Sequence, residues 1–165
     1  IFFTTGLIDY FRNLKIIAWT TLIFGLLLFF ADRSQIKRKL DTNLNYKNIL
    51  IVGLFQVLAI VPGVSRSGIV ITASRFLSFD RVDSSKIAFY LSIPALAGAS
   101  FLGIKKILET STNFNLIFLT SIIFSFFISY LTIKYFLIYV KKFDLKFFVY
   151  YRIFLALILF VIIYS

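Results

Sequence analysis

Residues 48–79 read NILIVGLFQVLAIVPGVSRSGIVITASRFLSF, and they set the topology of the whole chain. Their apolar residues form two runs, 48–61 and 69–79, on either side of the polar break PGVSRSG at 62–68. A helix needs about 20 apolar residues to cross a hydrocarbon layer of ~30 Å, and neither run is that long. The pattern therefore predicts two half-helices joined by an irregular segment, neither of which is long enough to cross the membrane alone.

The composition places these half-helices in a membrane protein. Of the 165 residues, 60% are hydrophobic and only 15% are charged, with 22 phenylalanines, and the mean hydropathy is +0.94. Soluble domains average roughly 45–50% apolar and about 25% charged residues. We expect an all-α polytopic membrane protein with four main transmembrane helices plus a re-entrant helix pair. The four spans are predicted at 16–31, 87–104, 116–133 and 147–164.

Two residue types are missing, and their absence limits the chemistry. The chain has no cysteine and no histidine, which excludes a disulfide framework, a thiolate nucleophile, an imidazole base and a histidine-bound metal within it. The net charge of +11 would suggest nucleic acid in a soluble protein. In a membrane protein it is better explained as an orientation signal, so we predict no nucleic-acid partner.

Charge counting indicates how residues 48–79 meet the membrane. Fifteen Lys and Arg residues lie in predicted loops, and a single crossing by 48–79 would divide them 7 to 8. If 48–79 instead enters and leaves on one face, the loops 32–47, 80–86 and 134–146 share 11 of them. Cytoplasmic loops are enriched in Lys and Arg. We therefore predict a single membrane domain, 1–165, with a re-entrant segment at 48–79 and these three loops in the cytoplasm.

The break at 62–68 is the predicted site of chemistry. Irregular backbone at membrane depth is tolerated only inside protein or beside a watery cavity. Gly63 and Gly68 allow the backbone to approach a ligand closely, and Ser65 or Ser67 can cap the half-helix that follows. That helix end and the charge of Arg66 together favour an anion such as phosphate. The alternative is a simple kink in which Arg66 pairs with a carboxylate from elsewhere in the fold or from a ligand, since no acidic residue occurs between 41 and 80.

Three stretches carry a resemblance to a known family. The run GLFQVLAIVPGVSRSG at 53–68 resembles the second signature of the undecaprenyl-diphosphate phosphatase family, the bacitracin-resistance membrane phosphatases. The run FYLSIP at 89–94, with Ala-Gly-Ala at 97–99, and the late Tyr-Arg-Ile at 151–153 fit the same family in order and spacing. The resemblance covers nearly the whole chain.

The resemblance implies an enzyme of the bacterial inner membrane. It would remove the terminal phosphate from a C55 isoprenyl diphosphate and so recycle the lipid carrier of cell-wall precursors. Its partners would be this polyprenyl diphosphate and membrane lipids, and a homodimer is compatible with the resemblance. The family has two inverted repeats, each with a re-entrant helix pair, an architecture shared with transporters.

This sequence begins at Ile1 without a methionine, and we expect it to be a C-terminal fragment that supplies the second half of the inverted-repeat fold. The family's glutamate-rich stretch and SSTGH motif belong to the first repeat. We therefore expect the 165 residues alone to be inactive. A divalent cation, Mg or Ca, would take its ligands from that first repeat.

The resemblance also implies roles for single residues. Arg66 would hold the diphosphate, and Ser65 would present a hydroxyl to the scissile phosphate as nucleophile or as donor. The cradle would be shaped by Gly63, Ser67 and Gly68. Gln56 would contact the phosphate or a metal-bound water, and a buried glutamine that satisfies freed backbone groups is an equal alternative.

Three other positions need comment. The family usually has threonine two residues after the second glycine of the break, where this chain has Val70. Thr72 is about 200° further round a helix and cannot simply replace it. For Arg75 and Arg152 we expect structural roles, as cations whose long side chains reach the inner membrane surface.

Other functions fit the same residues less well. A lipid phosphatase of the vanadium-haloperoxidase type needs histidines, and none is present here. A transporter or lipid flippase with a broken-helix anion site remains the main alternative. A membrane interaction protein without catalysis is the third, and the cluster PGVSRSG speaks against it.

Overall fold

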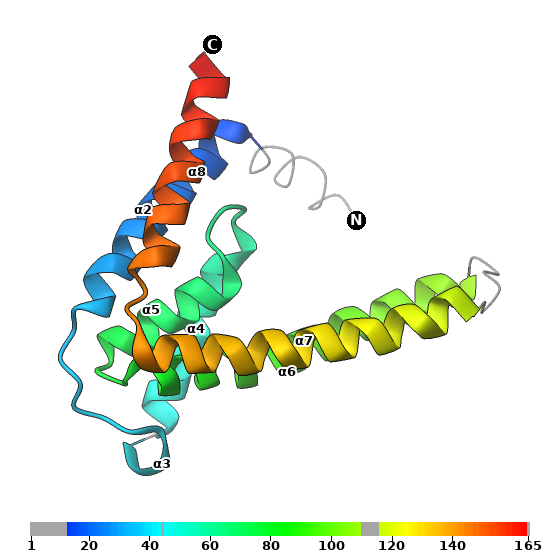
Figure 1. Ribbon diagram of the computed structural model, residues 1–165, viewed down its shortest axis with the longest axis horizontal. Helices are drawn as coiled ribbons and strands as arrows, with labels where there is room; N and C mark the ends of the chain where they lie inside the picture. Colours follow the sequence, from blue (N-terminus) through cyan, green and yellow to red (C-terminus); the bar gives the residue numbers. More distant parts are fainter. Residues whose placement is uncertain (1–12, 44, 110–115, 165) are drawn as a thin grey trace. The chain divides into compact units, whose positions relative to one another are not determined.

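The computed structural model describes residues 13–43, 45–109 and 116–164, which are predominantly helical (Figure 1). The helices are α2 (Leu14–Asp32), α3 (Leu40–Asn43), α4 (Tyr46–Val57), the 3₁₀ turn η1 (Leu58–Ile60), α5 (Arg66–Phe76), α6 (Arg81–Glu109), α7 (Leu116–Lys142) and α8 (Lys146–Tyr164). They form two compact units. The first contains 1–88 and 144–165, and the second contains 89–143.

Four of the described helices are long and apolar enough to cross a membrane: Leu14–Asp32, Arg81–Lys105, Phe118–Lys142 and Lys146–Tyr164. They match the four predicted spans and confirm the all-α polytopic fold. The predicted loops 80–86 and 134–146 were wrong in extent, because α6 begins at Arg81 and α7 continues to Lys142. A helix can continue through lysine and arginine residues, because their backbone groups form the usual helical hydrogen bonds while their long side chains extend to water. Hydropathy therefore marks the edge of the apolar run rather than the end of the helix.

Helices α2 and α8 lie side by side and run in opposite directions (Figure 1). Near the start of α2, the ring of Trp19 packs edge-on against Phe160 near the end of α8, with centroids 5.2 Å apart. At the other end, the Leu145 amide that precedes α8 donates to the Asp32 carboxylate at 3.2 Å. This antiparallel pair is the support against which the rest of the first unit packs.

The 48–79 stretch forms a hairpin of two short helices. Helices α4 and α5 have 12 and 11 residues and contact each other. The chain before α4 meets the chain after α5, since the amides of Lys37 and Arg38 both donate to the Ser78 carbonyl, at 3.0 and 3.1 Å. The amide of Leu40 donates to Asp83 at 2.9 Å. The hairpin therefore begins and ends at one level of the fold.

The helix ends within the hairpin differ from the prediction. Helix α4 ends at Val57 and is followed by η1, whereas the apolar run continues to Val61. Helix α5 begins at Arg66 rather than near Ile69. The earlier start follows from Ser65, whose side chain caps the helix and allows the next residue to be helical.

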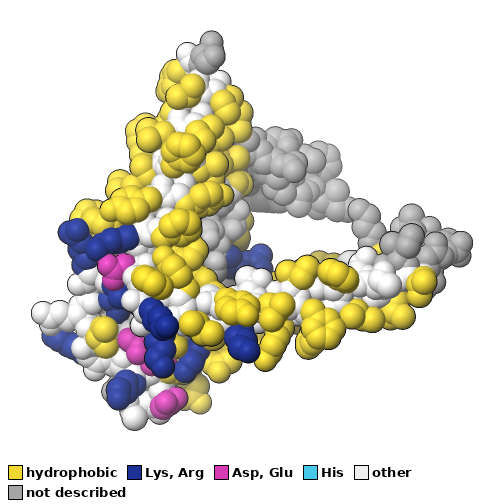
Figure 2. Space-filling view, in the orientation of Figure 1, with side chains coloured by type: hydrophobic (Ala, Val, Ile, Leu, Met, Phe, Trp, Pro, Cys, Tyr) yellow, Lys and Arg dark blue, Asp and Glu magenta, His cyan; other side chains and the backbone are white. Residues whose placement is uncertain are grey.

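Asp32 ties the ends of several helices together. Its buried carboxylate accepts from Arg81 Nε at 2.6 Å and Nη2 at 3.0 Å, as well as from the Leu145 amide. Charged side chains gather at this end of the first unit, below the hydrophobic side chains of the α2–α8 pair (Figure 2). The loops 32–47, 80–86 and 134–146 all have residues here, as expected if they share one face. The side of the membrane on which they lie stays a prediction.

Arg75 fixes the end of α5 to the same point. It is only 2% exposed, and it donates to the carbonyls of Asp32 at 2.7 Å, Ser34 at 2.8 Å and Phe79 at 2.5 Å. Its structural role is confirmed, but the expectation that it reaches the membrane surface was wrong. The carbonyls left free where α2 and α5 end supply acceptors for a buried guanidinium.

The Asp32 cluster gives a stability prediction. Asp32→Asn leaves the positive charges of Arg75 and Arg81 without their buried counter-charge, and breaking such a pair costs about 3–5 kcal/mol. We expect Asp32→Asn to lower the free energy of unfolding in detergent by that order. Asp41→Asn, at an exposed position in α3, is the matched control and should change it by less than about 0.5 kcal/mol. Equal stability of the two variants would contradict the role given to Asp32.

Candidate active site

The irregular segment that joins η1 to α5 is held against the middle of α2. Thr20 Oγ1 donates to the Pro62 carbonyl at 2.7 Å and also lies 2.8 Å from the carbonyl of Ile16 in its own helix. Thr21 Oγ1 makes a longer contact of 3.4 Å with the Gly63 carbonyl. Two neighbouring threonines thus supply donors to backbone carbonyls that no helix satisfies.

Gly63 is the closest point of this contact. Its φ is +90°, and a Cβ added there would lie 2.2 Å from Thr20 Oγ1 and 2.8 Å from the Ile17 carbonyl oxygen. A side chain at this position would therefore clash with α2, including its backbone. The structure explains the glycine by packing against a helix, and its predicted part in a ligand cradle stays a prediction.

Arg152 holds the same segment from α8, the helix packed beside α2. It lies on α8, is 8% exposed, and its Nη2 donates to the Gly63 carbonyl at 2.6 Å. Its Nη1 lies 3.2 Å from the place where a Cβ on Gly68 would be. The expectation that Arg152 extends to the membrane surface was therefore wrong. An arginine inside an apolar span is a functional candidate by default, and that signal could have identified it.

Ser65 has the geometry of a helix cap. Its Oγ accepts from the Gly68 amide at 3.3 Å, which confirms Ser65 as one of the two predicted caps. The hydroxyl proton is not used in this bond. Its φ of 62° is unusual for a residue with a side chain and costs of order 1–3 kcal/mol. Strain of this kind persists where the surrounding contacts enforce it, and here the segment is held from both α2 and α8.

Arg66 and Ser67 project from the first turn of α5 and are exposed. In the part of the chain that the structure describes, neither side chain has a hydrogen bond or ion pair. The amides of a first helical turn also have no acceptor within the helix and carry a partial positive charge. Arg66 and the hydroxyl-bearing residues Ser65 and Ser67 therefore stand at a helix end suited to an anion. The alternative of a simple kink requires a carboxylate paired with Arg66, and no carboxylate forms an ion pair with it among the described residues.

The remaining predicted positions have mixed outcomes. Gln56 lies in the last turn of α4, and its Oε1 is buried with no donor among the described residues. This oxygen is able to accept a hydrogen bond from a water molecule, whereas any contact with an ionised phosphate would use the Nε2 amide of the same side chain. Val70 is buried, and Thr72 donates to the Gly68 carbonyl at 2.7 Å. Thr72 therefore does not supply the hydroxyl that the family pattern places at position 70.

A divalent cation would need carboxylate ligands near the anion site. No group of three or more His, Cys, Asp or Glu side chains that could hold a metal occurs among residues 13–43, 45–109 and 116–164. In the first unit, Asp32 and Asp144 belong to the cluster at the end of α2. The expectation of a Mg or Ca ion with ligands from the first repeat stays a prediction.

Comparison with known proteins identifies the family. The family model described as bacitracin resistance protein BacA matches residues 1–158. This chain belongs to the BacA family. Together with the four apolar helices, the family makes it a multi-pass membrane protein.

Two relatives of this BacA chain share the name undecaprenyl-diphosphatase. The undecaprenyl-diphosphatase of Pelagibacter ubique strain HTCC1062 is 54% identical over 98% of the chain and 64% of its own length. The undecaprenyl-diphosphatase of Elusimicrobium minutum strain Pei191 is 41% identical over 92% of the chain and 57% of its own length. The chain therefore spans roughly three fifths of the length of these relatives.

The close contact at Gly63 gives a second prediction. Gly63→Ala should displace the segment from Thr20 and impose a strained φ, lowering the unfolding free energy by about 2–4 kcal/mol. Gly53→Ala is the matched control within α4, because nothing lies within 4 Å of its added Cβ. It should leave stability unchanged or raise it by up to about 1 kcal/mol. Thermal unfolding of both variants in one detergent checks this, and a Gly63→Ala protein as stable as Gly53→Ala would show that the contact is not formed.

Proposed function

We propose that the protein carrying this chain removes the terminal phosphate from undecaprenyl diphosphate, and that residues 62–68 bind the diphosphate. The observation that carries the proposal is the exposed Arg66 fork beside two hydroxyls at the start of α5. The names of the relatives favour a hydrolase over the transporter or flippase alternative. The reaction consumes one water and yields undecaprenyl phosphate and inorganic phosphate.

We also propose that 48–79 is re-entrant and that its tip lies near the middle of the membrane. Thr21 is 11 residues before Asp32 along α2, a distance of about 17 Å. Arg152 is seven residues after Leu145, about 10 Å along α8. The amide of Leu145 donates to Asp32, so the distances along α2 and along α8 are measured from the same depth in the fold. They support a tip at roughly half the depth of a ~30 Å hydrocarbon layer.

This depth suits a lipid diphosphate if the site opens to water. The substrate's hydrocarbon tail can stay in lipid while its charged head meets Arg66 and the start of α5. A guanidinium binds two phosphate oxygens at once, and in a site of low polarity such bonds are strong. Binding there would neutralise the charge of the transferring phosphoryl group, which is the main requirement of phosphoryl transfer.

Ser65 is best placed to donate a hydrogen bond. Its oxygen already accepts from Gly68, and its proton is free to bond a phosphoryl oxygen. Attack by this oxygen would need a base to take the proton, and no carboxylate contacts Ser65 among the described residues. The chain's own groups thus support binding and orientation of the diphosphate. Activation of a nucleophile and help for the leaving phosphate are to be sought outside the described residues.

Arg66 provides the central test of the proposed activity. Arg66→Lys keeps the charge but loses the planar fork, so we expect phosphate release to fall by about a hundredfold, as when a preorganised donor is removed. The assay measures phosphate released from a polyprenyl diphosphate by the whole protein in detergent. Arg38→Lys, at the other end of the hairpin, is the control and should retain activity. Normal turnover by Arg66→Lys would favour a simple charge or a structural pairing.

Two substitutions at Ser65 distinguish the proposed contact of its hydroxyl with the phosphate from its role as the cap of α5. Ser65→Ala loses both and keeps the strained φ, which should cost about 1 kcal/mol of stability. Ser65→Gly loses the hydroxyl but relieves the strain, so its stability should be close to wild type. If the hydroxyl contacts the phosphate, both variants lose most activity, and Ser67→Ala loses little. Activity that survives in Ser65→Gly would show that Ser65 acts only as a cap.

A further inference from the structure

A cluster of charges at the Asp32 end of the α2–α8 pair lies about 10–17 Å from the anion site along these helices. It contains four cations, Arg33, Arg75, Arg81 and Lys146, and three carboxylates, Asp32, Asp80 and Asp144. Among the described residues, Arg33 is the one of these cations that forms no ion pair with a carboxylate. A cation without an ion pair at the end of a membrane span is able to bind an anion.

The two carboxylates that form ion pairs in this cluster, Asp32 and Asp144, are already engaged. Asp32 is bonded to Arg81 and lies 3.8 Å from Arg75 Nε. Asp144 pairs with Lys146 at 2.8 Å and with Arg81. The hydrogen bond from Lys146 and the charge of Arg81 lower the pKa of Asp144, so this carboxylate stays ionised and occupied. Neither acid is free to neutralise Arg33.

Arg33 is held in a shape suited to phosphate. Its guanidinium carbon lies 4.1 Å from the ring centroid of Phe29, one turn earlier on α2, in a cation–π contact. The side chain is exposed, and its N–H groups have no acceptor among the described residues. An arginine stacked by its face keeps its N–H edge open for two oxygens of one phosphate. Phe29 thus orients the fork before any ligand arrives.

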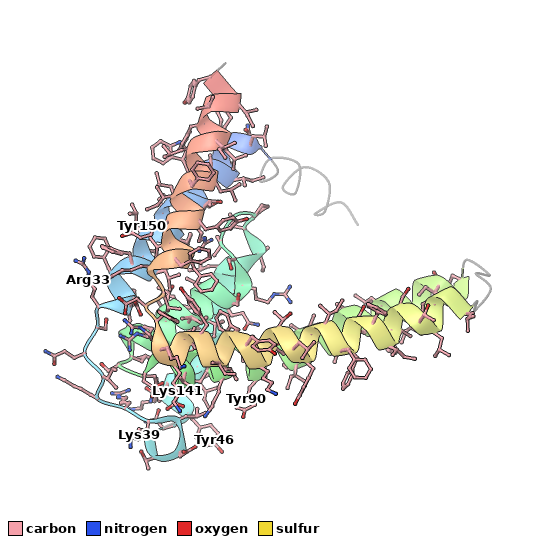
Figure 3. The ribbon with its side chains drawn as sticks, viewed as in Figure 1. Arg33, Lys39, Tyr46, Tyr90, Lys141 and Tyr150 are labelled. Carbon is pink, nitrogen blue, oxygen red and sulfur yellow. The ribbon has the colours of Figure 1, made fainter. Side chains whose placement is uncertain are left out.

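A second cation and a hydroxyl lie beside it. The bond between Asp32 and Leu145 brings the start of α8 to the end of α2, so Lys146, which is paired with Asp144, also lies near enough to Arg33 to be affected by its charge. Tyr150 is one turn after Lys146 on α8 and is 62% exposed. Figure 3 shows Arg33 and Tyr150 at the same edge of the α2–α8 pair. A bound phosphate would give Arg33 a counter-charge beside the Asp144–Lys146 pair.

We propose that Arg33, Lys146 and Tyr150 bind the phosphate of an anionic phospholipid, at a site separate from the one at 62–68. The position of the cluster favours a lipid over a soluble phosphate as the ligand. The cluster lies where α2 ends and α8 begins, and the ends of membrane spans are at the level of the lipid headgroups. Exposed apolar side chains continue from it along both helices, such as Phe30 at 59% and Phe154 at 64% (Figure 2). Acyl chains can lie along these side chains while the phosphate meets the two cations.

The test measures lipid binding by native mass spectrometry on the whole protein in detergent. We expect one dioleoyl phosphatidylglycerol to bind in preference to dioleoyl phosphatidylcholine. Arg33→Ala should weaken phosphatidylglycerol binding by about tenfold, and Lys146→Gln by a similar factor, because each removes a charge-assisted contact. The affinity of Arg33→Lys for phosphatidylglycerol should lie between those of the wild type and of Arg33→Ala, since lysine keeps the charge and loses the planar fork. An excess of glycerol 3-phosphate should not displace the lipid.

Lys47→Ala is the matched control, because it removes one exposed positive charge from the same end of the first unit without a stacked partner. Its effect should stay below about twofold. Equal effects of Arg33→Ala and Lys47→Ala would overturn the proposal in favour of diffuse attraction. Displacement by glycerol 3-phosphate would overturn it in favour of a soluble anion. Helical circular dichroism shows whether each variant is folded, and if Arg33→Ala is not, Arg33→Lys and Lys146→Gln decide the matter.

Discussion

The backbone of the segment joining η1 to α5 is not helical. In the re-entrant arrangement proposed above it lies at membrane depth, where lipid offers no donors for its carbonyl groups. An unsatisfied carbonyl in hydrocarbon costs several kcal/mol, so the surrounding helices must supply the hydrogen bonds. Thr20 supplies one to Pro62, and Arg152 supplies one to Gly63. The packing of the hairpin tip against both members of the α2–α8 pair follows from this requirement, because the donors come from both helices.

The same two helices also fix the base of the hairpin. Asp32 at the end of α2 binds Arg81 and the backbone before α8, and Arg75 joins the end of α5 to this point. The hairpin is therefore held at its base by buried charges and at its tip by hydrogen bonds to carbonyls. With both places fixed, Arg66 and the start of α5 have a defined position, and a phosphate site can be preorganised rather than assembled on binding.

Local patterns predicted the elements, but not the contacts between them. The break at 62–68, the four spans and a serine cap are visible in the sequence, because each depends on hydropathy or on residues a few positions apart. The contact of Gly63 with Thr20 joins residues 43 apart, and that of Arg152 with Gly63 joins residues 89 apart. Such contacts depend on how helices pack. Arg75 and Arg152 were therefore assigned to the membrane surface, although the fold buries both.

Accessibility of single cysteines is the most direct test of the re-entrant hairpin, since the chain has no cysteine of its own. One cysteine replaces exposed Lys37 before the hairpin, another replaces Lys86 after it, and a third replaces exposed Asn13 near the start of α2. Each is treated in intact cells or inverted vesicles with a maleimide that cannot cross the membrane. The account predicts that positions 37 and 86 react from one face and position 13 from the other. Reaction of positions 37 and 86 from opposite faces would contradict it.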